Sequence, residues 1–296
     1  MLKALYGSVI LVLVTILWGS SFVFIKFSVE NISGFSYTFY RSLISIASLT
    51  PLVVVEIFRK KVDLKSIRYG FITGVSYMLG LLLQGIGTAY TIPSISAFIT
   101  GLNTVHVHIY TALIEKTYSP LLFLSLVLAI TGLYMVTKPS GGLGFGELMV
   151  FLGSIAWAAE IVLISRYARR DIKRVEFLYG LLLPSLFLVP YVLFIEKTLN
   201  LSYTTWLYLS YLAIACTLVA TALQVIGQRY IGEATAAIIY ILEPIFALIF
   251  SVIIYGEKPE LLAVLGGITM VIASAIAILD EILKQKNLDK SLSVSK

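Results

Sequence analysis

Two acidic residues lie inside long apolar runs of this sequence, where a charged group is costly. Glu243 stands beside Pro244 in the run YILEPIFALIF, and Glu160 stands in the run WAAEIVLISRY. A charge at the centre of a bilayer costs about 3 kcal/mol on insertion scales, so such an acid faces protein, water or a ligand, or carries a proton. Pro244 cannot donate to the carbonyl of Tyr240, which leaves an acceptor beside Glu243. The pair predicts either a broken helix that lines a polar cavity, or a kink tied to a neighbouring helix.

Glu160 also allows two interpretations. It can face a cavity, where it would bind a cationic group or carry a proton, or it can reach along its helix to the basic cluster at Arg166–Arg170. The residue 139 positions earlier is Ser21, which lies in a patch of small polar residues that follows Trp18. Such a patch permits the close approach of a second helix, or of a ligand, to the backbone.

A second group of polar residues recurs at helical spacing. Asn103, His106 and Tyr110 fall on one stripe of a helix, together with Ser96. We expect His106 either to respond to pH in a cavity or to make a packed hydrogen bond between helices. His106 and His108 lie on different faces and have no nearby cysteine or carboxylate at ligand spacing, so the pattern does not indicate a metal site.

Two basic residues lie near the expected outer ends of apolar segments. Arg41 stands a few residues inside the second segment, and Lys26 stands near the end of the first. Long basic side chains in such places reach the membrane interface or form structural ion pairs. We therefore expect structural roles for both, with Glu30 as the partner of Lys26.

No pattern in the chain indicates catalysis, a metal or a cofactor. A serine nucleophile with base and acid partners, a metal-ligand cluster and a phosphate-binding loop are all missing from the sequence. The single Cys216 lies in an apolar run, so there is no disulfide framework. The clusters of basic residues are typical of the cytoplasmic loops of membrane proteins. We expect a protein that is not an enzyme and does not bind nucleic acid.

The composition places these residues in a membrane protein. The chain has 296 residues, of which 59% are hydrophobic and 13% charged, whereas soluble domains carry about 25% charged residues. A helix crosses the bilayer with about 20 mostly apolar residues. Ten such segments follow one another in the sequence: 5–27, 35–57, 68–89, 92–114, 121–138, 145–165, 176–195, 204–227, 235–255 and 260–281. The prediction is an all-α integral membrane protein with ten transmembrane helices.

The distribution of lysine and arginine predicts the orientation of these helices. With the N-terminus inside, the inward connections and both ends hold 17 basic residues, and the outward connections hold three, Lys138, Lys197 and Lys258. Basic residues accumulate on the cytoplasmic side of membrane proteins. We therefore expect both termini to be cytoplasmic in a multi-pass protein of the cytoplasmic membrane.

The chain also repeats itself weakly. Trp18 and Trp157 are 139 residues apart, and QGIGTAY at 84–90 matches QVIGQRY at 224–230, which pairs Gln84 with Gln224. Residues 1–138 and 145–283 are predicted to be two five-helix repeats, and 284–296 a disordered cytoplasmic tail. Because five is odd, the second repeat enters the membrane from the opposite side. Inverted repeats of this kind occur in transporters, with the substrate site near the midplane.

Several of these stretches resemble the drug/metabolite transporter superfamily, and within it the EamA-type ten-helix transporters. They are LWGSSFVFIKF, YRSLISIASLTPL, WAAEIVLISRYARR and EPIFALIFSVIIYGEKP, and the most specific piece is Glu243-Pro244 followed by Gly256-Glu257. The resemblance covers about residues 5–280. It implies movement of small metabolites, often amino acids, and a central cavity between the repeats. The chain departs from the family pattern at LIEKTYSP, at NTVHVH and at Glu160.

These observations combine into one expectation about function. We expect a secondary transporter of amino acids or related small metabolites that works by alternating access in the efflux direction, with protons as a candidate coupling ion, as a monomer or a homodimer. The alternatives are a passive channel and a transporter of sugar-phosphate or nucleotide-sugar anions. The side chains expected at the cavity are Glu160, Glu243, Tyr240, Trp18, Ser21, Trp157, Asn103, His106, Gln84 and Gln224, and those expected to have structural or gating roles are Pro244, Arg41, Lys26, Gly256 and Glu257.

Overall fold

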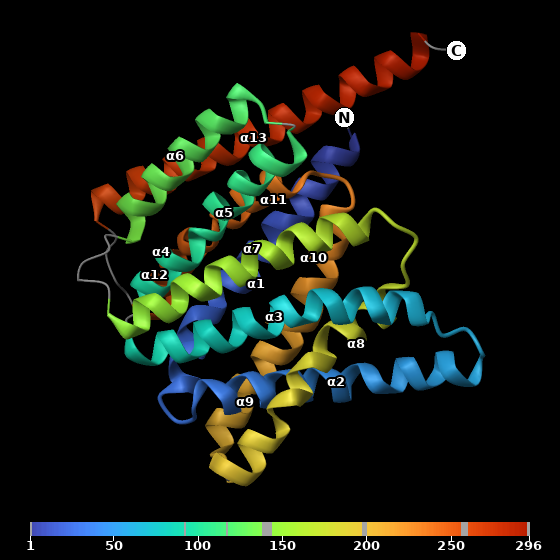
Figure 1. Ribbon diagram of the computed structural model, residues 1–296. Coiled ribbons are helices and arrows are strands. Elements are labelled where there is room, and N and C mark those ends of the chain that lie inside the picture. Colours follow the sequence, from blue (N-terminus) through green and yellow to red (C-terminus); the bar gives the residue numbers. More distant parts are fainter. Residues whose placement is uncertain are drawn as a thin grey trace.

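All regular structure in the described part of the chain is helical. The computed structural model describes residues 2–91, 93–116, 118–137, 144–196, 200–255 and 260–294. The first five predicted segments correspond to α1 (Leu2–Val29), α2 (Gly34–Phe58), α3 (Leu64–Tyr90), the group α4 (Pro93–Gly101), α5 (Asn103–Tyr110) and η1 (Thr111–Glu115), and α6 (Pro120–Thr137). The other five correspond to α7 (Phe145–Ala168), the group α8 (Arg174–Leu182), η2 (Leu183–Leu188) and η3 (Tyr191–Glu196), the group α9 (Tyr203–Tyr211), η4 (Leu212–Val219) and α10 (Ala220–Gln228), the pair α11 (Glu233–Tyr240) and α12 (Glu243–Tyr255), and α13 (Leu261–Val294). Figure 1 shows their arrangement as one helical bundle.

The predicted class, an all-α integral membrane protein, is confirmed. Within the described residues, nine helices are long and apolar enough to cross a membrane. The seventh predicted segment, 176–195, is divided among α8, the 3₁₀-helix η2 and the π-helix η3, because Pro184 and Pro190 each remove a helical hydrogen-bond donor. Polar caps begin several helices: the Ser33 hydroxyl accepts from the Ser36 amide, and the Ser202 hydroxyl from the Thr205 amide.

Two helical segments are broken at matching places. α4 ends at Gly101 and α5 begins at Asn103, while α11 ends at Tyr240 and α12 begins at Glu243. Asn103 and Glu243 are therefore the first residues of the two second halves, and they lie 140 positions apart. The break next to Pro244 precedes the proline, because proline fits well in the first turn of a helix, where its missing N–H is not needed.

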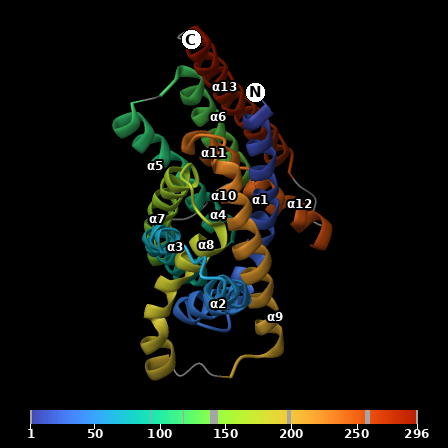
Figure 2. The same cartoon turned by 90° about the vertical axis from the view of Figure 1, so that its right-hand side faces the viewer.

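Glycines set the closest contacts between helices. A Cβ atom at Gly70 or Gly74 of α3 would overlap the backbone of α8, and one at Gly180 of α8 would overlap α3. Close contacts of the same kind join Gly7 of α1 to Gly227 of α10, Gly87 of α3 to Gly146 of α7, and Gly132 of α6 to Gly266 of α13. Small residues are typical of such interfaces in membranes, since dispersion contacts between backbones replace the hydrophobic effect there. Figure 2 shows α6 beside α13, and α1 beside α10.

The C-terminal region differs from the expected disordered tail. α13 continues to Val294, so the stretch from 284 is helical as far as the structure describes it. The sequence KQKNLDKSLSV has no glycine or proline to stop a helix. Lys284 pairs with Asp280 at 2.8 Å one turn back, and the Gln285 amide donates to the Tyr230 carbonyl at 2.7 Å. Both ends of the chain lie at the same end of the bundle (Figure 1).

Candidate functional site

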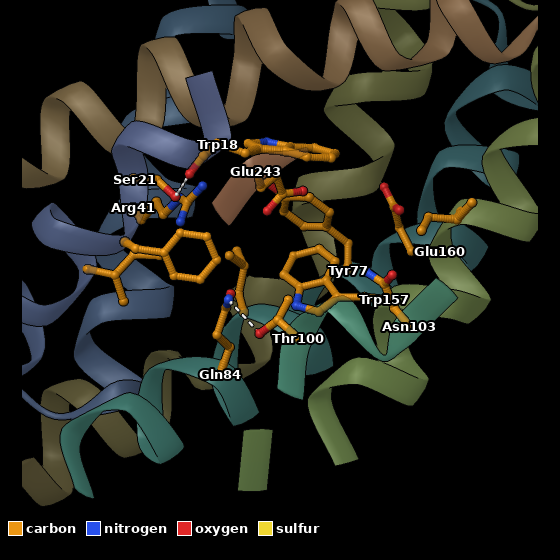
Figure 3. Close-up of a pocket in the computed structure, with 14 residues that line it drawn as sticks. Trp18, Ser21, Arg41, Tyr77, Gln84, Thr100, Asn103, Trp157, Glu160 and Glu243 are labelled. Atoms are coloured by element: carbon orange, nitrogen blue, oxygen red, sulfur yellow. Dashed lines mark hydrogen bonds between the residues drawn. The ribbon is translucent and has the colours of Figure 1, made fainter. Parts of the chain in front are cut away.

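A polar cavity lies among α1, α2, α3, the broken segment α4–α5, α7 and the start of α12 (Figure 3). Seven of the residues predicted at the cavity line it: Trp18, Ser21, Gln84, Asn103, Trp157, Glu160 and Glu243. Its other polar lining residues are Arg41, Tyr77 and Thr100, and its apolar ones are Phe22, Ile25, Leu81 and Ile161. The cavity volume is about 50 Å³, and one buried water needs roughly 10–15 Å³ on such a measure, so there is room for a few waters.

Glu160 is the more deeply buried of the two acids. Its side chain comes from the middle of α7 and is 1% exposed. The Gln224 amide donates to one carboxyl oxygen, Oε2, at 3.1 Å, while Oε1 has no hydrogen-bond partner in the described part of the protein. The alternative of a contact with the basic cluster after α7 is therefore wrong. Arg169 of that cluster instead pairs with Glu233 at 3.3 Å, and Arg170 stacks on Tyr69.

Glu243 lies where the broken helix meets the cavity. It is the first residue of α12 and is half-buried, and none of the described protein groups hydrogen-bonds its carboxyl. Gly19 of α1 permits this arrangement, since a Cβ atom there would come within 2.7 Å of the Glu243 carbonyl oxygen. The small polar patch after Trp18 thus brings α1 against the backbone at the break. Pro244 follows as a buried residue of the first turn of α12.

Arg41 was expected to reach the membrane interface or to form a structural ion pair, but it does not lie at the interface. It is 3% exposed and lines the cavity. Its Nε donates to the Thr217 hydroxyl at 2.8 Å, its Nη1 to the Tyr37 hydroxyl, and its Nη2 to the Cys216 carbonyl at 3.4 Å. No carboxylate in the described ranges lies within ion-pair distance of the guanidinium. The expectation was wrong because α2 turns this face inward against the neighbouring helix η4.

The π-helix η4 provides the acceptors that hold this wall of the cavity. The wider turn of a π-helix disturbs the regular hydrogen-bond ladder, and such turns often occur at functional sites. The Cys216 carbonyl accepts from the indole Nε1 of Trp18 at 3.0 Å and from Arg41. The neighbouring Thr217 hydroxyl accepts from Arg41 and from the Tyr77 hydroxyl, the latter at 3.2 Å. One turn of one helix therefore fixes side chains from α1, α2 and α3.

Three residues predicted at the cavity lie behind its wall. Tyr240 packs edge-to-face on Trp18 with ring centroids 5.1 Å apart and donates its hydroxyl to Gln228 at 3.1 Å. Gln224 supports Glu160, as described above. His106 is half-buried and its Nε2 lies 3.2 Å from the Ser154 hydroxyl, which corresponds to the packed hydrogen bond of the two alternatives.

Gln84 of the cavity lining and Lys26, which was predicted to be structural, each join neighbouring helices. Gln84 donates to the Thr100 hydroxyl at 3.2 Å across α3 and α4. Lys26 lies 3.9 Å from Glu30, and its ammonium also donates to carbonyls at the end of α3, including those of Thr88 at 3.2 Å and Thr91 at 3.3 Å. A cation at a helix C-terminus satisfies carbonyls that have no partner within the helix. Gly256 and Glu257 lie outside the described residues.

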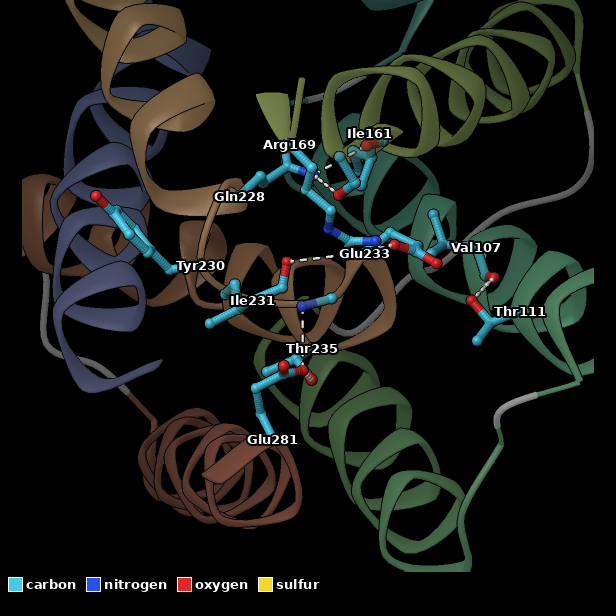
Figure 4. A network of polar contacts seen from close by, with 12 residues as sticks. Val107, Thr111, Ile161, Arg169, Gln228, Tyr230, Ile231, Glu233, Thr235 and Glu281 are labelled. Carbon is cyan, nitrogen blue, oxygen red and sulfur yellow. Dashed lines mark hydrogen bonds and ion pairs between the residues drawn. The ribbon is translucent and has the colours of Figure 1, made fainter. Parts of the chain in front are cut away.

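A polar network continues from this region toward the end of the bundle that holds both termini (Figure 4). The Gln228 amide donates to the Ile161 carbonyl at 2.9 Å and to the Ser165 hydroxyl at 2.6 Å. Further along, Arg169 also reaches the Ile231 carbonyl at 3.4 Å, and the Gly232 amide donates to Glu281 at 3.0 Å. These contacts tie α7, α10, α11 and α13 together. In the described residues, no group of three His, Cys, Asp or Glu side chains is placed to hold a metal ion.

Comparisons with known proteins agree with this architecture. The sequence pattern of the EamA-like transporter family matches residues 5–138 and again residues 144–279. A protein of Archaeoglobus fulgidus named an uncharacterized transporter is 29% identical over 86% of this chain and 80% of its own length. The uncharacterized transporter YdfC of Bacillus subtilis is 25% identical over 86% of this chain and 85% of its own length. A solved crystal structure that is 15% identical superposes with a TM-score of 0.73, covers 93% of this chain and 97% of its own, and so shares the fold.

Proposed function

The chain belongs to the EamA-like transporter family, and from this premise we propose that it is a secondary transporter that exports amino acids or related small metabolites across the cytoplasmic membrane. The observation that carries the proposal is the cavity at the two helix breaks, where Oε1 of Glu160 and the carboxyl of Glu243 accept from no donor in the described part of the protein. Buried acids of this kind suit the ammonium group of a substrate or a transported proton. Trp18, Tyr77 and Trp157 add an aromatic lining for an apolar side chain.

The proposal includes two inverted repeats that rock against each other. It is supported by the two family matches, which divide the chain near its middle. It is also supported by the glycine contacts: the pair Gly7 and Gly227 joins the first and eighth segments, and the pair Gly146 and Gly87 joins the sixth and third. Across the two halves Gly7 corresponds to Gly146 and Gly227 to Gly87, so the two glycine pairs are equivalent. The helix breaks before Asn103 and Glu243 obey the same exchange.

The size of the cavity supports the proposal of alternating access. A volume of about 50 Å³ is too small for an amino acid, since it holds a few waters. Substrate entry therefore requires the walls to separate. The network of Arg169, Glu233 and Glu281 joins α7, α11 and α13 within the second half of the chain, and would move with that half.

The proposed orientation places both termini in the cytoplasm, on the basis of the charge asymmetry. Cysteines introduced at Lys61 and Asn200, which are both exposed, are then expected to react with an impermeant thiol reagent from opposite sides of the membrane. The measurement is labelling of intact cells and of inverted vesicles in a background that lacks Cys216. Labelling of both positions from the same side would contradict this topology.

Transport by reconstituted protein tests the function itself. Proteoliposomes preloaded with a mixture of unlabelled amino acids and amines are expected to accumulate labelled amino acid by counterflow, with a saturable initial rate. A passive channel would give flux that neither saturates nor shows counterflow. A transporter of sugar-phosphate or nucleotide-sugar anions is disfavoured, because Arg41 is accompanied by two carboxyl groups in the cavity lining. Mass spectrometry of the vesicle contents identifies which compounds exchange.

A further inference from the structure

We propose that Arg41 is the binding site for the carboxylate of the substrate, so that the cavity selects zwitterions, with both an acid and an amine, over simple amines. This inference rests on the proposed function and goes further, because it assigns the two charged groups of the substrate to opposite walls. It also gives a specific role to a residue whose sequence position indicated an interface contact or a structural ion pair.

The guanidinium of Arg41 retains N–H donors that none of the described residues accepts from. An arginine side chain has five N–H groups in a planar fork. Three of them are directed at Thr217, Tyr37 and the Cys216 carbonyl, one each from Nε, Nη1 and Nη2. One N–H group on each terminal nitrogen is left, and two such donors on one guanidinium can bind a carboxylate in bidentate fashion.

The surroundings hold Arg41 in place but do not neutralise it. Its three partners are a hydroxyl, a phenol and a backbone carbonyl, and the residue is 3% exposed. Among the described residues the guanidinium forms no ion pair. A buried cation without a counter-ion is unfavourable in a membrane protein. A carboxylate that enters the cavity supplies the missing charge, so binding of an acidic group is favoured at this wall.

The opposite side of the cavity suits the other end of a zwitterion. In Figure 3, Arg41 and Glu160 lie on opposite sides, and Glu243 lies between them in the view. The Oε1 atom of Glu160 lacks a partner within the described structure, as does the indole Nε1 of Trp157. An ammonium group near the acids and a carboxylate on Arg41 would satisfy groups on both walls. A simple amine would leave the guanidinium unpaired and is therefore expected to bind more weakly.

Paired ligands that differ by one carboxylate test this assignment. Purified protein in detergent is titrated with L-phenylalanine and phenethylamine, and with L-leucine and isoamylamine, and affinity is measured by thermal stabilisation and by competition in counterflow. The unchanged protein is expected to bind each amino acid about tenfold or more tightly than the matching amine, because the amine lacks a bidentate charged contact. Arg41→Gln is expected to remove this preference by weakening the amino acid, while affinity for the amine stays within about twofold.

Arg41→Lys gives a second test, which does not require the protein to fold with an uncharged side chain at this position. It keeps the charge but removes the fork, so the preference should fall to an intermediate value with affinity for the amine unchanged. A preference that survives intact in folded Arg41→Gln or Arg41→Lys protein would overturn the assignment. Equal binding of amino acid and amine by the unchanged protein would also overturn it while leaving transport of cationic compounds in place. Binding of neither ligand class would overturn both this inference and the proposed amino-acid substrate.

Discussion

Glu160→Gln is expected to reduce the rate of amino-acid counterflow by about tenfold or more and to flatten its dependence on pH. The carboxyl is 1% exposed and one of its oxygens faces the cavity without a partner. A hydrogen bond to a charged group is worth about 1.5–3 kcal/mol, so loss of the carboxylate from an ammonium contact predicts an effect of this size. Glutamine has the same shape and can still accept from Gln224, so the fold should be retained. The initial rate is measured in proteoliposomes between about pH 5 and 8.

The matched control is Glu30→Gln. Glu30 is an exposed acid beyond the end of α1, and it does not line the cavity. Its contact with Lys26 at 3.9 Å is a surface ion pair, which contributes about 1 kcal/mol or less. Transport by this variant should match that of the unchanged protein. If Glu160→Gln protein, present in normal amounts, behaved like this control at every pH, the role of Glu160 in the cavity would be refuted, and Glu243 would be the remaining acid for a cationic group.

Gly74→Ala is expected to destabilise the protein strongly. A Cβ atom at this position would overlap the carbonyl oxygen of Leu181 in α8, and that oxygen belongs to the backbone and cannot rotate away. Overpacking of this kind costs about 1–3 kcal/mol, occasionally more. The melting temperature of the purified protein in detergent should fall by several degrees, and the amount of monodisperse protein should fall with it.

Gly267→Ala is the control for this change. Gly267 lies in α13, and the nearest atom to an added Cβ would be Ile245 Cγ1 at 3.8 Å, an ordinary contact distance. Alanine also favours helix over glycine. This variant should melt at or slightly above the temperature of the unchanged protein. Equal melting temperatures for the two variants would show that α3 and α8 do not cross as closely as described.

Charge in apolar sequence was the feature that located the site. Glu160 and Glu243 could be predicted at a cavity because a carboxylate in a transmembrane run must find a partner, whatever the details of packing. The same argument predicted the wrong position for the Arg41 side chain, because a long side chain near a helix end can also reach the membrane interface. The choice depended on which face of α2 meets η4, and hydropathy along a single chain does not contain that information.

The other cavity residues differed in how visible they were. Thr100 lies on the stripe formed by Ser96 and Asn103, so its helical spacing was a usable signal that the sequence interpretation did not apply. Tyr77 had no such signal, because it is one of 18 tyrosines and its role depends on the hydroxyl of Thr217. One helix break was marked clearly in the sequence, by Pro244 beside Glu243. The other had a weaker signal in Gly101, two residues before Asn103, which the sequence interpretation did not apply.

The π-helix η4 divides the span from Tyr203 to Gln228 into two parts that serve different neighbours. One extra residue in a turn rotates everything after it by about 100° relative to an uninterrupted α-helix. α9 and η4 pack on α1 and α2, while α10 packs on α1 and α7. A single continuous helix would offer one stripe to all of them. The extra residue rotates the side chains of α10 about the helix axis relative to those of α9. Deletion of one residue within 212–219 would therefore turn Gln224 away from Glu160 without altering any other amino acid.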